Sequence, residues 1–261
     1  MEIQSLIRKL VDTHAHLHMP HFDKNREELL EVVKQMRFVL NVSTSMEDLS
    51  STLEVTDALP NTFASVGIHP HDALNVPKNY MDVLRDLAKS NKKVISIGEI
   101  GLDYFRNLSP IDVQRKVFAE QLMLANELKR PVVLHIRDAY KDAYEIVKLI
   151  GAEKGGIVHA FSGDERWARE FVKLGFKIGV GGPLTYPKND SLRTVVKIIG
   201  IKNIVTETDC PYLPPQQYRG KRNEPMYVYY VFEELNRIFG YEVYEAIWEN
   251  TKEVFELSEV D

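Results

Sequence analysis

The strongest constraint on the fold is a regular alternation of short apolar segments with amphipathic ones along the whole chain. Eight segments are rich in apolar and β-branched residues, and we predict them to be strands: 10–14, 38–42, 63–68, 94–99, 132–136, 156–160, 176–180 and 203–207. They are largely apolar on both faces, which is typical of strands in a parallel sheet that helices cover. The pattern therefore predicts an α/β fold built on a parallel sheet.

Segments with apolar residues at helical spacing lie between these strands. We predict helices around 29–33, 49–58, 81–88, 110–129, 143–150, 168–172 and 192–199, and one or two more within 224–258. Ser109 and Pro110 indicate the start of the fourth helix, with Ser109 as its cap and Pro110 at its first position.

Eight strands that alternate with eight helical stretches over about 250 residues favour a single (β/α)₈ barrel of the TIM type. With 261 residues, the chain is long enough for one such domain spanning residues 1–261. A doubly wound open sheet is the alternative. No Gly-x-Gly-x-x-Gly follows the first predicted strand, which argues against the dinucleotide-binding form of that alternative.

The composition excludes several classes of protein. With 44% hydrophobic and 27% charged residues, the chain is an ordinary globular protein rather than a disordered one. Cys210 is the one cysteine, so neither an internal disulfide nor a Cys-rich zinc module is possible. The formal net charge of -5 argues against a protein that coats duplex DNA by charge alone. It is compatible with a nuclease that contacts a few phosphates in one cleft.

The sequence contains no sign of membrane insertion or export. No apolar run approaches the ~18 residues of a membrane span. The first residues contain neither the apolar core nor the cleavage site of a signal peptide. We therefore expect a cytoplasmic protein without membrane association, and the sequence indicates no protein partner.

The histidines have an unusual distribution, because each lies at the end of a predicted strand or in the loop after it. They are His14, His16, His18, His21, His69, His71, His135 and His159. Three carboxylates share this location, namely Asp12, Glu99 and Asp209. Barrel enzymes build their sites at the carboxyl ends of the strands. We therefore predict a metal site there, with nitrogen and oxygen ligands that suit Zn, Mn or Mg.

The spacing of these residues suggests individual roles. His14 and His16 are two apart in a strand, so their side chains point to the same face and can bind one cation together. Glu99 has two oxygens and can bridge two cations, although an ordinary salt bridge is the alternative. His135 and His159 lie on neighbouring strands and can bind a second cation or form simple hydrogen bonds. Asp209 can bind a metal, orient a nucleophile, accept its proton, or cap a turn before Pro211.

Nine segments together resemble the motifs of a known family. They are VDTHAHLH (11–18), VGIHPH (66–71), IGEIGLDY (97–104), PVVLHIRDA (131–139), VHAFSG (158–163), GVGGPLTY (179–186), TETDCPYLPP (206–215), RGKRNEP (219–225) and NTKEVFEL (250–257). In content and order they are similar to the TatD family of metal-dependent deoxyribonucleases, which belongs to the amidohydrolase-type barrels. The resemblance covers the chain from residue 11 to residue 257.

The resemblance implies a centre with two divalent cations. His14, His16 and Asp209 would hold one cation, His135 and His159 would hold the other, and Glu99 would bridge them. Many related amidohydrolases have a carboxylated lysine at the bridging position, so Glu99 points away from those branches. The family often has serine where this chain has Cys210, for which we expect a packing role.

The resemblance also implies hydrolysis of DNA phosphodiester bonds. The enzyme would act as an exonuclease on single strands or strand ends. Two cations about 3.5–4 Å apart would bind the attacking and leaving oxygens. Asp209 would accept a proton from the attacking water. His69 would contact the scissile phosphate or the leaving group, or form a supporting hydrogen bond.

Other residues are candidates for binding the substrate. Arg219, Lys221 and Arg222 form a basic loop suited to phosphate oxygens, unless the loop is merely solvated. Tyr104, Phe105 and Tyr186 are candidates for stacking on bases, with ordinary packing as the alternative for each.

Two other classes of function stay open at this point. One is a barrel hydrolase of another ester class, such as a lactonase, amidase or phosphotriesterase, because the fold supports many reactions. The other is a non-catalytic metal-binding module.

Overall fold

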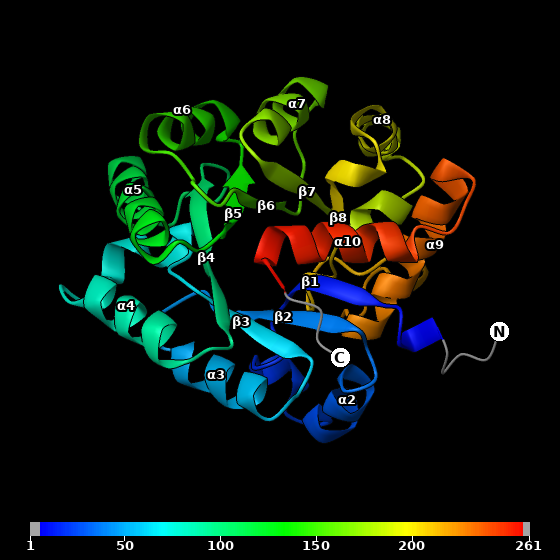
Figure 1. Cartoon of the computed structure of the whole chain (residues 1–261), viewed down its shortest axis with the longest axis horizontal. Helices are drawn as coiled ribbons and strands as arrows, with labels where there is room; N and C mark the ends of the chain where they lie inside the picture. The colour runs from blue at the N-terminus through cyan, green and yellow to red at the C-terminus, as the bar shows by residue number, and fades with distance from the viewer. Residues whose placement is uncertain (1–5, 258–261) are drawn as a thin grey trace.

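The structure is a computed structural model that describes residues 6–257. Eight parallel strands form one sheet in the order β1 to β8, and helices surround it (Figure 1). The strands are β1 (Val11–Ala15), β2 (Phe38–Val42), β3 (Thr62–Val66), β4 (Val94–Asp103), β5 (Val132–Arg137), β6 (Gly156–His159), β7 (Phe176–Val180) and β8 (Ile204–Thr206). The prediction of a TIM-type barrel is confirmed, and each predicted strand overlaps an observed one.

Helices follow the strands as the spacing of apolar residues predicts. They are α2 (Arg26–Val33), α3 (Leu49–Asp57), α4 (Tyr80–Ser90), α5 (Ile111–Leu128), α6 (Tyr140–Ile150), α7 (Glu165–Lys173), α8 (Asp190–Ile199), α9 (Val228–Phe239) and α10 (Tyr244–Phe255). The last predicted helical stretch, 224–258, contains two helices. In the described residues, no helix combines the length and the apolar character that crossing a membrane requires.

The prediction that Ser109 caps α5 is wrong. Pro110 precedes the first helical residue, and no side chain caps this end of the helix. The Ser109 hydroxyl instead donates to the carbonyl of His71 at 2.8 Å and accepts the N–H of Leu74 at 3.0 Å. Because His71 and Leu74 lie in the short 3-10 helix η2 (Pro70–Asn75), Ser109 joins two loops rather than starting a helix.

Strand β4 is longer than predicted and irregular near its centre. Its pairing with β5 shifts register between Ile97 and Ile100. The N–H of Glu99 donates to the carbonyl of Ser43, just beyond β2, at 3.1 Å. Glu99 therefore lies within the strand, not at its end, at the point where the strand departs from regular pairing.

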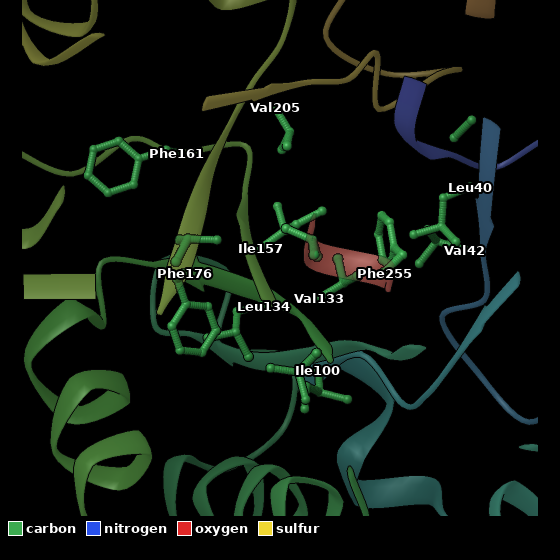
Figure 2. Packing of buried hydrophobic residues seen from close by; sticks show 14 of the residues in the cluster. Leu40, Val42, Ile100, Val133, Leu134, Ile157, Phe161, Phe176, Val205 and Phe255 are labelled. Carbon is green, nitrogen blue, oxygen red and sulfur yellow. The ribbon is translucent and has the colours of Figure 1, made fainter. Parts of the chain in front are cut away.

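Helix α10 packs against the amino-terminal end of the barrel. The Asn250 side chain donates to the carbonyls of Ile201 and Ile204 at 2.7 Å each, where β8 begins. Phe255 stacks on Phe38, the first residue of β2, with ring centroids 5.6 Å apart. Figure 1 shows α10 crossing the ring of strands, and Figure 2 shows Phe255 among apolar side chains of the core. The opposite, carboxyl-terminal end is left for the loops.

Strands β8 and β1 join mainly through side chains. The Thr206 hydroxyl donates to the carbonyl of Val11 at 2.7 Å, and the Thr13 hydroxyl donates to the carbonyl of Thr206 at 3.0 Å. Beyond the strands, Asp209 N–H donates to the carbonyl of His14 at 2.8 Å. We call these contacts the seam. They close the barrel where β8 is only three residues long.

We expect Thr206→Val to destabilise the protein without disturbing its packing, because valine has nearly the same shape. The substitution leaves the buried Val11 carbonyl without its partner, which costs about 1–3 kcal/mol. Urea unfolding with the metal removed measures this cost. Thr194→Val, at an exposed residue of α8 whose hydroxyl forms no hydrogen bond within residues 6–257, is the control. An unfolding free energy equal to that of the unmodified protein would show that the seam does not depend on this hydroxyl.

Candidate metal centre

A cavity of about 710 Å³ opens among the loops that follow the strands. Six of the residues predicted to act in catalysis or metal binding contribute to its wall, namely His16, His69, Glu99, His135, His159 and Asp209. His14 is fully buried directly beneath them. The structure therefore brings residues from β1, β3, β4, β5, β6 and β8 to one place.

His14 and His16 point to the same face of the chain, as their spacing predicts. Their Nε2 atoms are 3.3 Å apart. His14 Nε2 is 3.3 Å from Glu99 Oε2, and His16 Nε2 is 3.4 Å from Asp209 Oδ1. His16 Nδ1 lies 2.7 Å from the carbonyl of Val42 and must donate to it. With this proton on Nδ1, the neutral form of the ring has its lone pair on Nε2, the nitrogen that faces Glu99 and Asp209, as a metal ligand requires.

Glu99 is the centre of the cluster. Its Oε1 is 2.8 Å from His135 Nδ1, 3.6 Å from His69 Nε2 and 3.9 Å from His159 Nε2. Burial raises the pKa of Glu99, but the nearby imidazoles of His69 and His14 outweigh this effect and hold the pKa well below its usual range. The buried carboxylate is therefore ionised at neutral pH.

Asp209 faces Glu99 across the cluster. Its Oδ1 is 3.4 Å from His16 Nε2, 3.7 Å from His159 Nε2 and 3.9 Å from His14 Nε2. Burial raises its pKa, and the neighbouring imidazoles, led by His159, outweigh this and lower the pKa. Two ionised carboxylates thus lie in one buried cluster.

The donor set fits divalent cations. Three groups of donor atoms each lie within 4.8 Å of one another: His14, His16 and Glu99; His14, His159 and Asp209; and His69, Glu99 and His135. Within residues 6–257, neither Glu99 nor Asp209 forms an ion pair with lysine or arginine. Buried charges need a compensating partner, and metal coordination is one form of compensation.

Two features of these groups differ from the arrangement that the resemblance implies. The ring of His159 stacks on that of His14, with centroids 3.4 Å apart, so its Nε2 faces Asp209 as well as Glu99. His69 joins the group of Glu99 and His135, although we expected it to contact substrate rather than metal.

Two carboxylates that support the histidines were not identified in the sequence. Glu207 is buried, and its Oε2 lies 3.1 Å from His159 Nδ1 while its Oε1 accepts the N–H of Ala160 at 2.6 Å. Asp103 Oδ2 lies 3.2 Å from His135 Nε2 and 2.8 Å from His71 Nε2. Each can hold a ligand ring in place through its second nitrogen.

A glycine makes room for Glu207. A Cβ on Gly179 would meet Glu207 Oε2 at 2.4 Å. This contact explains the first glycine of the GVGG motif at 179–182. The glycine is visible in the sequence, but its reason is not. Only the contact between β7 and the end of β8 shows that Gly179 makes room for Glu207.

Asp12 does not belong to the cluster, although it lies in β1 with His14. Its carboxylate accepts the N–H and hydroxyl of Thr208 at 2.9 and 2.6 Å, and the N–H of His14 at 3.2 Å. Burial raises the pKa of Asp12 to about 7. Asp12 therefore supports the seam and orients the loop that carries Asp209.

The basic loop lies outside the cavity wall. Arg222 donates to the carbonyl of His21 at 2.7 Å, to Asn25 Oδ1 at 2.9 Å and to Glu224 Oε1 at 2.8 Å. Its guanidinium thus connects this loop to the loop after β1. Arg219 lies over the ring of Tyr186 at 4.2 Å, and Lys221 is exposed.

Two other arginines, which no motif or spacing in the sequence singles out, do line the cavity. They are Arg106, in the loop after β4, and Arg137, at the end of β5. Among the aromatic candidates, Tyr104 donates its hydroxyl to Asp142 at 2.8 Å and Tyr186 donates to the carbonyl of Pro214 at 2.8 Å. Phe105 is 61% exposed.

Comparison with known proteins agrees with this architecture. The family model described as "TatD related DNase" matches residues 11–256. The uncharacterized metal-dependent hydrolase YabD of Bacillus subtilis is 38% identical over 255 residues, which cover 95% of this chain and 100% of that protein. The 3'-5' ssDNA/RNA exonuclease TatD of a Rahnella species is 32% identical over 223 residues, covering 82% of this chain and 84% of that protein.

A solved structure agrees as well. The crystal structure of YjjV, a TatD homolog from Escherichia coli K12, superposes with a TM-score of 0.90 at 30% identity, covering 97% of this chain and 100% of that one. The strand-end histidines and the carboxylate cluster thus occur in a chain that belongs to the TatD family of metal-dependent hydrolases.

Proposed function

We propose that this protein is a metal-dependent nuclease that hydrolyses phosphodiester bonds in single-stranded DNA or at strand ends. The observation that carries the proposal is the pairing of a buried carboxylate and imidazole cluster with two arginines on the wall of the same cavity. A substrate with a phosphate anion suits both parts. The similarity to an exonuclease of single-stranded DNA and RNA supports the same substrate class.

We assign the ligands as the resemblance implies. His14, His16 and Asp209 would hold one divalent cation, His135 and His159 would hold a second, and Glu99 would be available to both. Mg, Mn and Zn all accept these donors. When bound, such cations supply Lewis-acid activation of a water and of the phosphate oxygens.

The protein's own groups then handle protons and charge. Asp209 is ionised and accepts a proton from the attacking water. Burial, with His135 nearby, lowers the pKa of His69 well below its usual value, so its ring is neutral. His69 Nδ1 accepts the N–H of His71 at 3.1 Å, which leaves the ring proton on Nε2. His69 can therefore donate a hydrogen bond to a phosphate oxygen or to the leaving group.

Arg219, Lys221 and Arg222 belong to the proposal as contacts for more distant phosphates of a longer strand, because they lie outside the cavity wall. We further propose that residues 1–261 act as one domain. The cytoplasmic location expected from the sequence stays a prediction.

The assay that tests the function compares substrate classes with Mg²⁺, Mn²⁺ or Zn²⁺ added. We expect end-labelled single-stranded oligonucleotides to be shortened progressively, while lactones, simple amides and phosphotriesters react far more slowly. Chelation with EDTA should stop the reaction, and added metal should restore it. Rapid turnover of a lactone with intact oligonucleotide would overturn the nuclease proposal and favour another barrel hydrolase.

We expect Glu99→Gln to fold normally and to lose at least about 100-fold in activity, or about 2.7 kcal/mol of transition-state stabilisation. Glutamine has nearly the same shape, but it removes the negative charge between the cations. Metal analysis after dialysis should find fewer than two metal ions per chain. Glu54→Gln, at an exposed residue of α3 whose carboxylate forms no hydrogen bond or ion pair within residues 6–257, is the control. A variant with two bound metals and normal turnover would exclude the bridging role.

The role of Glu207 is tested by its effect on metal affinity. Glu207→Ala should weaken metal binding roughly 10–100-fold, because His159 loses the group that orients its ring. Glu207→Gln should have an intermediate effect, because its single oxygen can accept from His159 Nδ1 or from the Ala160 N–H but not from both. Metal titrations followed by calorimetry measure both. Equal metal affinity in Glu207→Ala and the unmodified protein would show that Glu207 does not position the ligand.

A further inference from the structure

One exposed aromatic side chain, Phe105, lies against an arginine of the cavity wall, and we call Phe105, Arg106 and Arg137 the rim. Phe105 follows β4 directly and is 61% exposed. The guanidinium of Arg137 lies over its ring at 3.9 Å from the centroid. Asp103 pairs with Arg137 in the sheet, and Tyr104 N–H donates to the carbonyl of Arg137 at 2.9 Å. The two strand ends therefore position Phe105 and Arg137 together.

The loop that carries Phe105 is fixed by one buried side chain. Gln114 of α5 accepts the N–H of Asp103 at 2.9 Å through Oε1. Its Nε2 lies within 3.2 Å of the carbonyls of Asp103 and Ser109 and of Asn107 Oδ1. The segment 103–109 is thus attached to the barrel at both of its ends. An exposed aromatic on such a segment is preorganised for binding, which lowers the entropy lost when a ligand is bound.

The two arginines of the rim indicate an anionic ligand there, although the rest of the cavity wall is acidic. Asp72, Glu99, Asp103, Glu207 and Asp209 all contribute to the wall. Arg106 and Arg137 are the only lysine or arginine residues in that wall, as far as the described chain extends. The side chains of both arginines are exposed, and neither forms a hydrogen bond or an ion pair within residues 6–257. Their N–H groups are therefore available to phosphate oxygens, which the planar guanidinium matches well.

We propose that Phe105, Arg106 and Arg137 bind the nucleotide next to the bond that is cleaved, with Phe105 stacked on its base and the arginines on its phosphate. The inference rests on the proposed nuclease function and assigns the substrate contacts of the same cavity. Stacking on an aromatic face is open to every base, so this rim selects unpaired bases rather than a sequence. A base in a duplex is already stacked and paired, and its faces are not available to Phe105.

The test combines changes in the protein with changes in the substrate. We measure kcat and KM for single-stranded oligonucleotides that are either complete or carry one abasic residue at a chosen position near the cleaved end, with Mn²⁺ bound. Phe105→Ala should raise KM for the complete strand roughly 10-fold, in line with the stacking of one base. The unmodified protein should show a similar loss on the strand that is abasic at the stacked position. Phe105→Ala should then lose nothing more on that abasic strand, while Phe105→Trp should keep the affinity for the complete strand.

Arg137→Ala should weaken binding of complete and abasic strands alike, because it contacts phosphate. It should also reduce the slope of log affinity against log salt by about 0.7, the contribution of one phosphate on a single strand. Arg166→Ala is the matched control, since Arg166 lies over the Trp167 ring at 4.8 Å but away from the cavity. Leu149→Ala, at a side chain that is 85% exposed, is the matched control for Phe105→Ala.

The outcomes separate this inference from the proposed function. If the unmodified protein neither binds nor cleaves oligonucleotides, both fail. If it cleaves them and Phe105→Ala and Arg137→Ala match it on every strand, the inference fails and the nuclease function stands. Equal losses for Phe105→Ala on complete strands and on strands abasic at every tested position would overturn the stacking role of Phe105.

Discussion

The seam between β8 and β1 is the constraint on which the candidate metal centre depends. The chain meets itself there, because Thr206 and Thr13 bond across it and Asp209 N–H donates to the carbonyl of His14. These contacts place Asp209 against His14 and His16, although about three quarters of the chain separates them in sequence. Asp12 and Thr208 strengthen the same junction with a buried carboxylate and hydroxyl. The same contacts therefore close the barrel and bring the ligands together.

Glu99 is the electrostatic centre of the assembled site. It is 3% exposed and surrounded by imidazoles rather than by lysine or arginine. Such a carboxylate is stable in the interior only when positive charge compensates it, and a divalent cation bound by the surrounding histidines would provide that charge. Glu207 and Asp103 then limit the motion of the rings of His159 and His135. The cluster is therefore built in two layers, with the outer carboxylates orienting the inner ligands.

The cavity combines the acidic cluster with two exposed arginines of its wall, and one of these, Arg137, lies over the exposed ring of Phe105. The cluster suits cations, and the rim at Phe105, Arg106 and Arg137 suits a phosphate with an unpaired base. This division supports a nuclease over a lactonase, because a lactone offers no anion for the arginines to bind. The basic loop at 219–222 lies outside the cavity wall, and Arg222 within it donates to His21 and Asn25 in the loop after β1 and to Glu224 of its own loop.

Patterns that depend on neighbouring residues could be predicted from the sequence. The apolar runs predict the eight strands, and the histidines after them identify the end of the barrel that carries the site. The spacing of His14 and His16 predicts their shared direction, because strand geometry is local. Contacts between distant segments could not be predicted in this way. Glu207 behind His159, Ser109 bound to another loop, Arg222 held by the loop after β1, and Arg137 over Phe105 each require a partner whose position is set by the packing of separate elements. A residue's type limits the bonds it can make, but the folded chain determines which groups lie within reach.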